Sequence, residues 1–189
     1  MRRKDDEKEQ RIKEAVIELI LREGIDGTSI SKIARLANVS PATVYIYFDS
    51  KEDMMQAIYR EYSEDVYGYL VRSVSSRTDG ACLIETLIRS YYNYMNEHQE
   101  IFSFVEQCSR CPALSGCCGE NRGVAELFDL MKKMKREGII RNYSDENIAA
   151  VLFYPVKAIA LDHHTSEANR ESRLEELIEM ISRALLADQ

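Results

Sequence analysis

Apolar residues recur every three or four positions along almost the whole chain, which is the spacing of one face of an α-helix. Residues 6–23 show this spacing, and residues 174–185 show it again near the C-terminus. No segment alternates apolar and polar residues for long enough to indicate a strand. Only three prolines and eight glycines interrupt the 189 residues, so long flexible linkers are not expected. The pattern predicts an all-α protein.

Turn-forming and capping residues mark where the expected helices begin and end. Gly24 ends the first helix, and Thr28 or Ser29 caps the second. Ser40-Pro41 opens a third helix, because a cap hydroxyl followed by proline at the first helical position is a common helix start. The expected helices cover roughly residues 6–23, 28–34, 41–48, 51–74, 81–97, 99–109, 121–137, 145–164 and 170–187.

The net charge of −7 is unevenly distributed along the chain. Residues 1–50 hold equal numbers of basic and acidic side chains, whereas residues 51–189 carry the whole net negative charge. A surface that contacts DNA is therefore expected in the first fifty residues. The apolar stretches are far shorter than the ~20 residues that cross a bilayer, and no apolar signal segment follows the basic N-terminus. We expect a cytoplasmic protein without a membrane segment.

Residues 28–51, TSISKIARLANVSPATVYIYFDSK, predict a helix-turn-helix: a short helix, a tight turn around Asn38 and a second short helix. The second helix of such a unit can lie in the major groove of DNA. Val44, Ile46 and Phe48 are expected to face inward and hold this helix against its neighbours. The residues expected to face outward are Pro41, Ala42, Thr43, Tyr45 and Tyr47.

The first fifty residues resemble the DNA-binding domain of the TetR family of transcriptional regulators. The resemblance lies in the amphipathic helix ending at Glu23-Gly24, the helix at 28–34, the run 39–48 and Ser50-Lys51-Glu52-Asp53. It implies a helix-turn-helix domain at 1–50 and an effector-binding and dimerisation domain at 51–189. It also implies a regulator, most often a repressor that a small-molecule inducer releases from double-stranded operator DNA.

The same resemblance implies which residues contact DNA. Thr28, Tyr47 and Lys51 are expected on phosphates, and Thr43 and Tyr45 at or near base edges. The full expected set is Thr28, Ser29, Ser40, Pro41, Ala42, Thr43, Tyr45, Tyr47 and Lys51. Ser29 and Pro41 stand where many family members place Arg, Lys or Gln, so the operator sequence does not follow from the residues.

Two long helices near the C-terminus are expected to form a homodimer. One short recognition helix reads too few base pairs for useful specificity, which favours a symmetric pair of chains. The family layout places the interface on residues of about 145–164 and 170–187, as half of an intermolecular four-helix bundle. Part of each apolar stripe must instead pack within the chain.

Aromatic residues are abundant in the segments between the two ends of the chain. Eleven tyrosines and no tryptophan suggest an apolar effector cavity with several hydroxyl groups, although aromatic residues at helical spacing are more often core. The expected effector pocket comprises Tyr62, Tyr91, Tyr94, Phe102, Phe128 and Met131.

Four of the five cysteines crowd together as Cys108, Cys111, Cys117 and Cys118. The pattern fits a soft metal ion, a reversible disulfide between Cys108 and Cys111 beside Arg110, or unreactive thiols. A thiol-redox or metal-handling protein is therefore the alternative function, and a soft metal at this cluster is the one cofactor considered. No phosphate-binding loop, zinc-protease helix or nucleophile elbow occurs, so we do not expect an enzyme.

Overall fold

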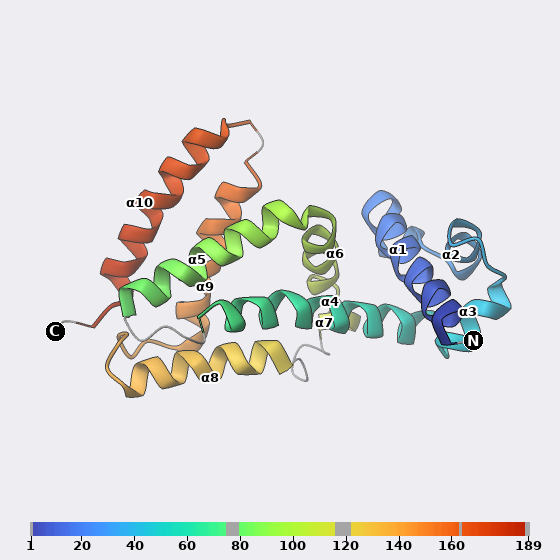
Figure 1. The fold of residues 1–189 in the computed structure, drawn as a ribbon, viewed down its shortest axis with the longest axis horizontal. Helices are drawn as coiled ribbons and strands as arrows, with labels where there is room; N and C mark the ends of the chain where they lie inside the picture. Colours follow the sequence, from blue (N-terminus) through green and yellow to red (C-terminus); the bar gives the residue numbers. More distant parts are fainter. Residues whose placement is uncertain (1, 75–79, 116–121, 163, 188–189) are drawn as a thin grey trace. The chain divides into compact units, whose positions relative to one another are not determined.

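The computed structural model describes residues 2–74, 80–115, 122–162 and 164–187, and these residues are mainly helical (Figure 1). Ile140 and Leu186 form an isolated bridge, and the described residues form no strand. The all-α prediction is confirmed. The helices are α1 (Arg2–Gly27), α2 (Ile30–Leu36), α3 (Pro41–Tyr47), α4 (Lys51–Val74), α5 (Gly80–Glu97), α6 (Gln99–Ser109), α7 (Pro112–Ser115), α8 (Arg122–Arg136), α9 (Asp145–Ala160) and α10 (Glu167–Leu185).

The chain divides into two compact units. The first unit comprises Met1–Ser63 and Glu100–Asn121, and the second comprises Glu64–Gln99 and Arg122–Gln189. The helix α4 contributes its first half to the first unit and its second half to the second. The compact units therefore do not coincide with the division at 50/51, which remains a proposal about where the two functions lie.

The first unit has an apolar core to which distant parts of the sequence contribute. Ile12 and Ile20 of α1, Ile33 of α2 and Val44 of α3 are fully buried. Phe104 of α6 is also fully buried in the same cluster. Its ring meets the edge of Tyr62, with 6.1 Å between the ring centroids. The three N-terminal helices thus share their core with α6.

In the second unit α5 packs against both α9 and α10, and α9 packs against α10. Arg89 of α5 pairs with Glu85 of its own helix at 2.9 Å. The same guanidinium reaches Glu171 at 3.0 Å and Glu175 at 2.5 Å on α10. Its hydrogen bond to Glu175 is the main cause that raises the pKa of Arg89. This ion-pair network joins α5 to α10 at a partly exposed site.

Some helix limits differ from those predicted. The helix α9 ends at Ala160 rather than near residue 164, because the next residues form a turn around Asp162. The Asp162 carboxylate accepts a hydrogen bond from the Thr165 hydroxyl at 2.7 Å. It also forms an ion pair with the Arg173 guanidinium at 2.7 Å. The Ser166 side chain then caps α10. The short helix α7 lies where a loop was expected.

Among the described residues, no helix combines the length and the apolar character that crossing a membrane requires.

Candidate DNA-binding interface

A break in α1 at Gly24 makes room for the turn that leads into α2. Gly24 has φ 78° and ψ 171°, a region that strongly favours glycine. The Thr28 hydroxyl donates a hydrogen bond to the Gly24 carbonyl at 2.9 Å, and the Thr28 N–H donates to the Ile25 carbonyl. Thr28 is only 2% exposed. Both donor groups are used within the turn, and the expected contact of Thr28 with a phosphate stays a prediction.

The helix α2 starts as predicted, with a serine cap. The exposed Ser29 side chain accepts a hydrogen bond from the Lys32 N–H at 3.4 Å. The Lys32 ammonium pairs with the Glu23 carboxylate at 2.6 Å and donates to the Gly27 carbonyl at 2.8 Å. The hydrogen bond from Lys32 is the main cause that lowers the pKa of Glu23. The ion pair therefore ties the start of α2 to the end of α1.

The turn between α2 and α3 is tight, and local interactions hold it. Asn38 has φ 54°, the left-handed conformation that asparagine tolerates. The Val39 N–H donates to the Ala34 carbonyl at 2.9 Å, which closes the end of α2. Ser40 then caps α3 by accepting from the Thr43 N–H at 3.1 Å, and the two hydroxyl oxygens lie 2.9 Å apart. This is the helix-turn-helix that the sequence predicted.

The two sides of α3 differ sharply in exposure. Val44 is fully buried and Phe48 is 7% exposed, as predicted. The prediction that Ile46 faces inward is wrong, because this side chain is 77% exposed. Two residues along a helix turn the side chain by about 200°, so a residue two places after a buried one faces away from the core. Tyr45 is 54% exposed.

Tyr47 and Lys51 lie where α3 leads into α4. Tyr47 is half-buried and packs against the core of the first unit. The Lys51 ammonium donates to the Ile25 carbonyl at 3.3 Å, which places it beside the turn between α1 and α2. The Ser50 side chain accepts from the Asp53 N–H at 3.0 Å and so caps α4. The expected DNA contacts Ser29, Pro41, Ala42, Tyr45 and Lys51 thus belong to one helix-turn-helix and the start of the next helix.

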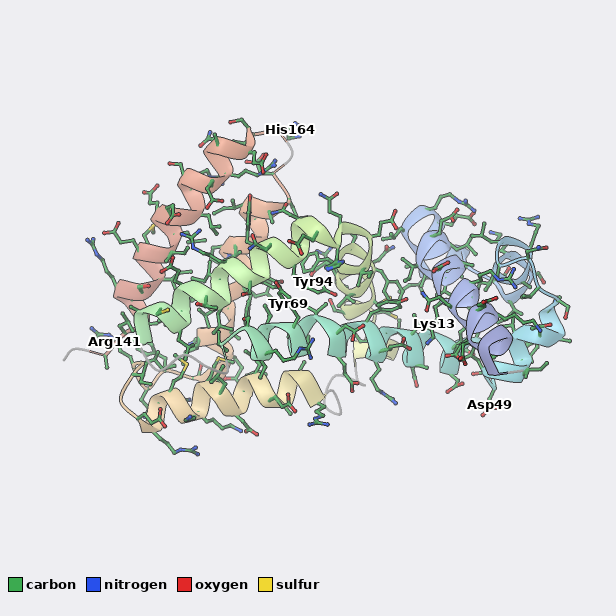
Figure 2. All side chains as sticks on the ribbon, viewed as in Figure 1. Lys13, Asp49, Tyr69, Tyr94, Arg141 and His164 are labelled. Carbon is green, nitrogen blue, oxygen red and sulfur yellow. The ribbon has the colours of Figure 1, made fainter. Side chains whose placement is uncertain are left out.

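The expected effector residues fall in both compact units. Tyr62 and Phe102 belong to the first unit, and Tyr91, Tyr94, Phe128 and Met131 belong to the second. All are buried except Phe128, which is half-buried. In the second unit, Tyr94 lies beside Tyr69 of α4 with 5.3 Å between the ring centroids (Figure 2). Burial of this kind suits a core or a pocket, so the effector pocket stays a prediction.

The cysteine cluster is described only in part. Cys108 and Cys111 are free thiols, whereas Cys117 and Cys118 lie outside the described residues. Burial, with a smaller effect from Cys111, raises the pKa of Cys108 to about 12. The Arg110 guanidinium pairs with Glu106 at 2.8 Å, and the expected reversible disulfide between Cys108 and Cys111 stays a prediction. In the part of the chain that the structure describes, no three His, Cys, Asp or Glu side chains gather as metal ligands.

The raised pKa of Cys108 predicts slow alkylation. The thiolate is the nucleophile, so a thiol with a pKa near 12 stays protonated and unreactive at pH 8. We expect iodoacetamide at pH 8 to label the half-buried Cys82 and Cys111 well before Cys108, as read by mass spectrometry of tryptic peptides. The three thiols should react alike after denaturation in urea. Labelling of Cys108 in the native protein as fast as Cys82 contradicts this assignment.

Comparisons with known proteins agree with this geometry. The family model described as bacterial regulatory proteins, tetR family, matches residues 12–58. The transcriptional repressor KstR2 of Rhodococcus jostii is 31% identical over 74 residues, and the alignment covers 39% of this chain and only 36% of that relative. A TetR family transcription regulator from Marinobacter aquaeolei has a solved structure that superposes over all of both chains, with a TM-score of 0.88 and 23% identity.

A further similar structure was solved with a ligand. The transcriptional regulator FadR from Bacillus subtilis, in complex with stearoyl-CoA, has a TM-score of 0.74 and 16% identity. The superposition covers 92% of this chain and 97% of FadR. At this level of identity the likeness establishes a shared fold.

Proposed function

Through its N-terminal domain the chain belongs to the tetR family of bacterial regulatory proteins, and we propose that it is a homodimeric repressor that a small-molecule effector releases from its operator. A regulator of this family binds DNA and is not an enzyme. The observation that carries the proposal is α3, with one side buried at Val44 and the other exposed at Tyr45 and Ile46.

In this proposal α3 enters the major groove of the operator. Pro41 and Ala42 are exposed and small, so the backbone at the start of α3 can approach the bases closely. Tyr47 at the end of α3, Ser29 at the start of α2 and Lys51 at the start of α4 supply contacts to phosphates, which fix the position of α3 on the duplex. Ser40 and Thr43 hold the start of α3 through their mutual hydrogen bonds.

A second copy of the chain completes the proposed DNA-binding protein. The helix α3 has only seven residues, which is too short to read a useful operator alone. Exposed apolar side chains on α9 and α10 support these helices as the interface, among them Tyr154 at 70% and Met180 at 60% exposure. The buried side of the same helices, including Leu152 and Ile178, belongs to the core of the second unit.

We place the effector among the aromatic residues of the second unit. Tyr91, Tyr94, Phe128 and Met131 offer apolar surface and hydroxyl groups, which suit a largely apolar organic molecule. Residues 51–74 form one continuous helix, α4. A ligand-induced shift of residues 64–74 therefore also moves residues 51–63, which follow α3. Stearoyl-CoA is the first probe, because it is bound in the FadR structure. An effector that releases the protein from its operator must weaken DNA binding. If stearoyl-CoA binds the protein without lowering its affinity for DNA, stearoyl-CoA is not this effector.

Replacing Lys51 tests the proposed phosphate contact. We expect Lys51→Ala to weaken binding to every DNA sequence, because phosphates are the same whatever the base sequence. The slope of log K against log salt should become shallower by about 0.9 for each phosphate that the variant no longer neutralises, or about 2 for a dimer. Fluorescence anisotropy with a duplex from upstream of the protein's own gene measures both effects.

A matched control removes a lysine elsewhere. Lys132 is exposed on α8 in the second unit, where it pairs with Asp129 at 3.3 Å. The variant Lys132→Ala removes the same charge and should keep the affinity and salt slope of the unmodified chain. Equal slopes for Lys51→Ala and Lys132→Ala contradict the assignment of Lys51 to phosphate.

A further inference from the structure

The exposed side of α3 is apolar. Ala42, Tyr45 and Ile46 are exposed, and Ile46 at 77% is more exposed than any other large apolar side chain of the described residues. Positions 45 and 46 follow position 42 by three and four residues, so the side chains of Tyr45 and Ile46 both adjoin Ala42 on one side of the helix. We call these three residues the α3 apolar face. Of these three side chains, only that of Tyr45 carries a polar group, its hydroxyl.

The polar groups of α3 offer little for reading bases by hydrogen bonds. The sequence Pro-Ala-Thr-Val-Tyr-Ile-Tyr contains no charged or amide side chain, so α3 cannot form the bidentate contacts that identify guanine or adenine. The hydroxyl of its threonine, Thr43, already makes one hydrogen bond, with the Ser40 hydroxyl at 2.9 Å. Apart from the tyrosine hydroxyls, the centre of this helix offers apolar surface to the bases.

The major groove displays an apolar group that such a face can recognise. Thymine carries a C5-methyl group there, and each base pair presents a distinct pattern in this groove. A branched aliphatic side chain that is exposed in the free protein gains free energy when it covers such a methyl group. The small side chain at Ala42 lets Ile46 approach the base edges, because nothing larger stands one turn before it.

We propose that the α3 apolar face reads thymine methyl groups, with Ile46 as the residue that distinguishes thymine from other bases. This inference rests on the proposed DNA-binding function and adds the chemistry of the operator to it. Each half-site then carries thymine beneath Ile46, and specificity at that position comes from a methyl contact.

Uracil tests the proposal because it differs from thymine only by the missing methyl group. The full chain is first used to enrich binding sites from a library of random duplexes. The enriched site is then synthesised with uracil in place of thymine at one position at a time, in both half-sites. We expect one such replacement to weaken binding by about fourfold per half-site, or more than about tenfold when both half-sites change.

Two variants connect this effect to Ile46. Ile46→Ala should bind the thymine and uracil duplexes with nearly equal affinity at the sensitive position. Its helix content, measured by circular dichroism, should be unchanged because the side chain is exposed. Leu36→Ala is the matched control, since Leu36 is an apolar residue of α2 with 40% exposure. This control should keep the full thymine preference.

The possible results distinguish thymine recognition by Ile46 from DNA binding as such. Enrichment of a defined site that tolerates uracil everywhere overturns thymine reading and leaves DNA binding intact. A thymine preference that survives in Ile46→Ala overturns the role of Ile46. A library that yields no enriched site overturns the proposed DNA-binding function itself.

Discussion

A single charge on the exposed side of α9 is expected to separate the dimer: the variant Tyr154→Asp should sediment as a monomer. Tyr154 is 70% exposed in the single chain, so the core of the second unit does not depend on it. In the proposed dimer the same position is covered, and an unpaired carboxylate is costly to remove from water. The effect should extend to DNA, because two linked recognition helices bind at least about a hundredfold more tightly than one.

The control for this variant places the same charge elsewhere. Tyr143 is 50% exposed and precedes α9, outside the proposed interface. Tyr143→Asp should remain a dimer and keep its DNA affinity. Sedimentation velocity at micromolar concentration and fluorescence anisotropy measure the two properties. A dimeric Tyr154→Asp with full DNA affinity contradicts the placement of the interface on α9.

Truncation of Phe104 is expected to loosen the helix-turn-helix from a position far away in the sequence. Phe104 is fully buried in the core that includes Ile20, Ile33 and Val44. Phe104→Ala removes the ring that meets Tyr62 and leaves a cavity. A change of this kind lowers the free energy of unfolding by about 3–5 kcal/mol. The amides of α1–α3 should therefore exchange hydrogen faster.

Hydrogen exchange followed by mass spectrometry locates the effect. Phe153→Ala is the matched control, because Phe153 is half-buried in the second unit, where its ring lies 4.9 Å from that of Tyr91. This control should leave exchange in α1–α3 unchanged. If Phe104→Ala also leaves α1–α3 protected, the helix α6 is not part of the core that holds the helix-turn-helix.

Features that depend on neighbouring residues were predictable from the sequence. Ser40 and Pro41 start α3 through a cap and a fixed φ, and Asn38 adopts the left-handed conformation of the tight turn. Ser29 likewise caps α2. These capping and turn residues act on positions within a few residues of themselves. The helix-turn-helix could therefore be predicted from the sequence alone.

Features that depend on distant residues were not predictable. No local sequence pattern indicates that Phe104 belongs to the core of the first unit, because core residues such as Ile20, Ile33 and Val44 lie far away in the sequence. Buried tyrosines such as Tyr91 and Tyr94 have the same spacing in a core as in a pocket, so the sequence pattern does not separate the two.

The error at Ile46 has a different origin. Its apolar character favoured the core, but the helix geometry fixed by Val44 and Phe48 turns it outward. The helical spacing alone therefore placed Ile46 on the exposed side of α3.

We propose that this chain binds a specific DNA site through α3 as a dimer. The most direct measurement is enrichment from random duplexes, followed by the stoichiometry of the purified chain on the enriched duplex. We expect an inverted repeat that binds two chains, with half-sites about one helical turn of DNA apart or a multiple of this distance. Binding without preference for any sequence, or one chain per site with no repeat, contradicts it.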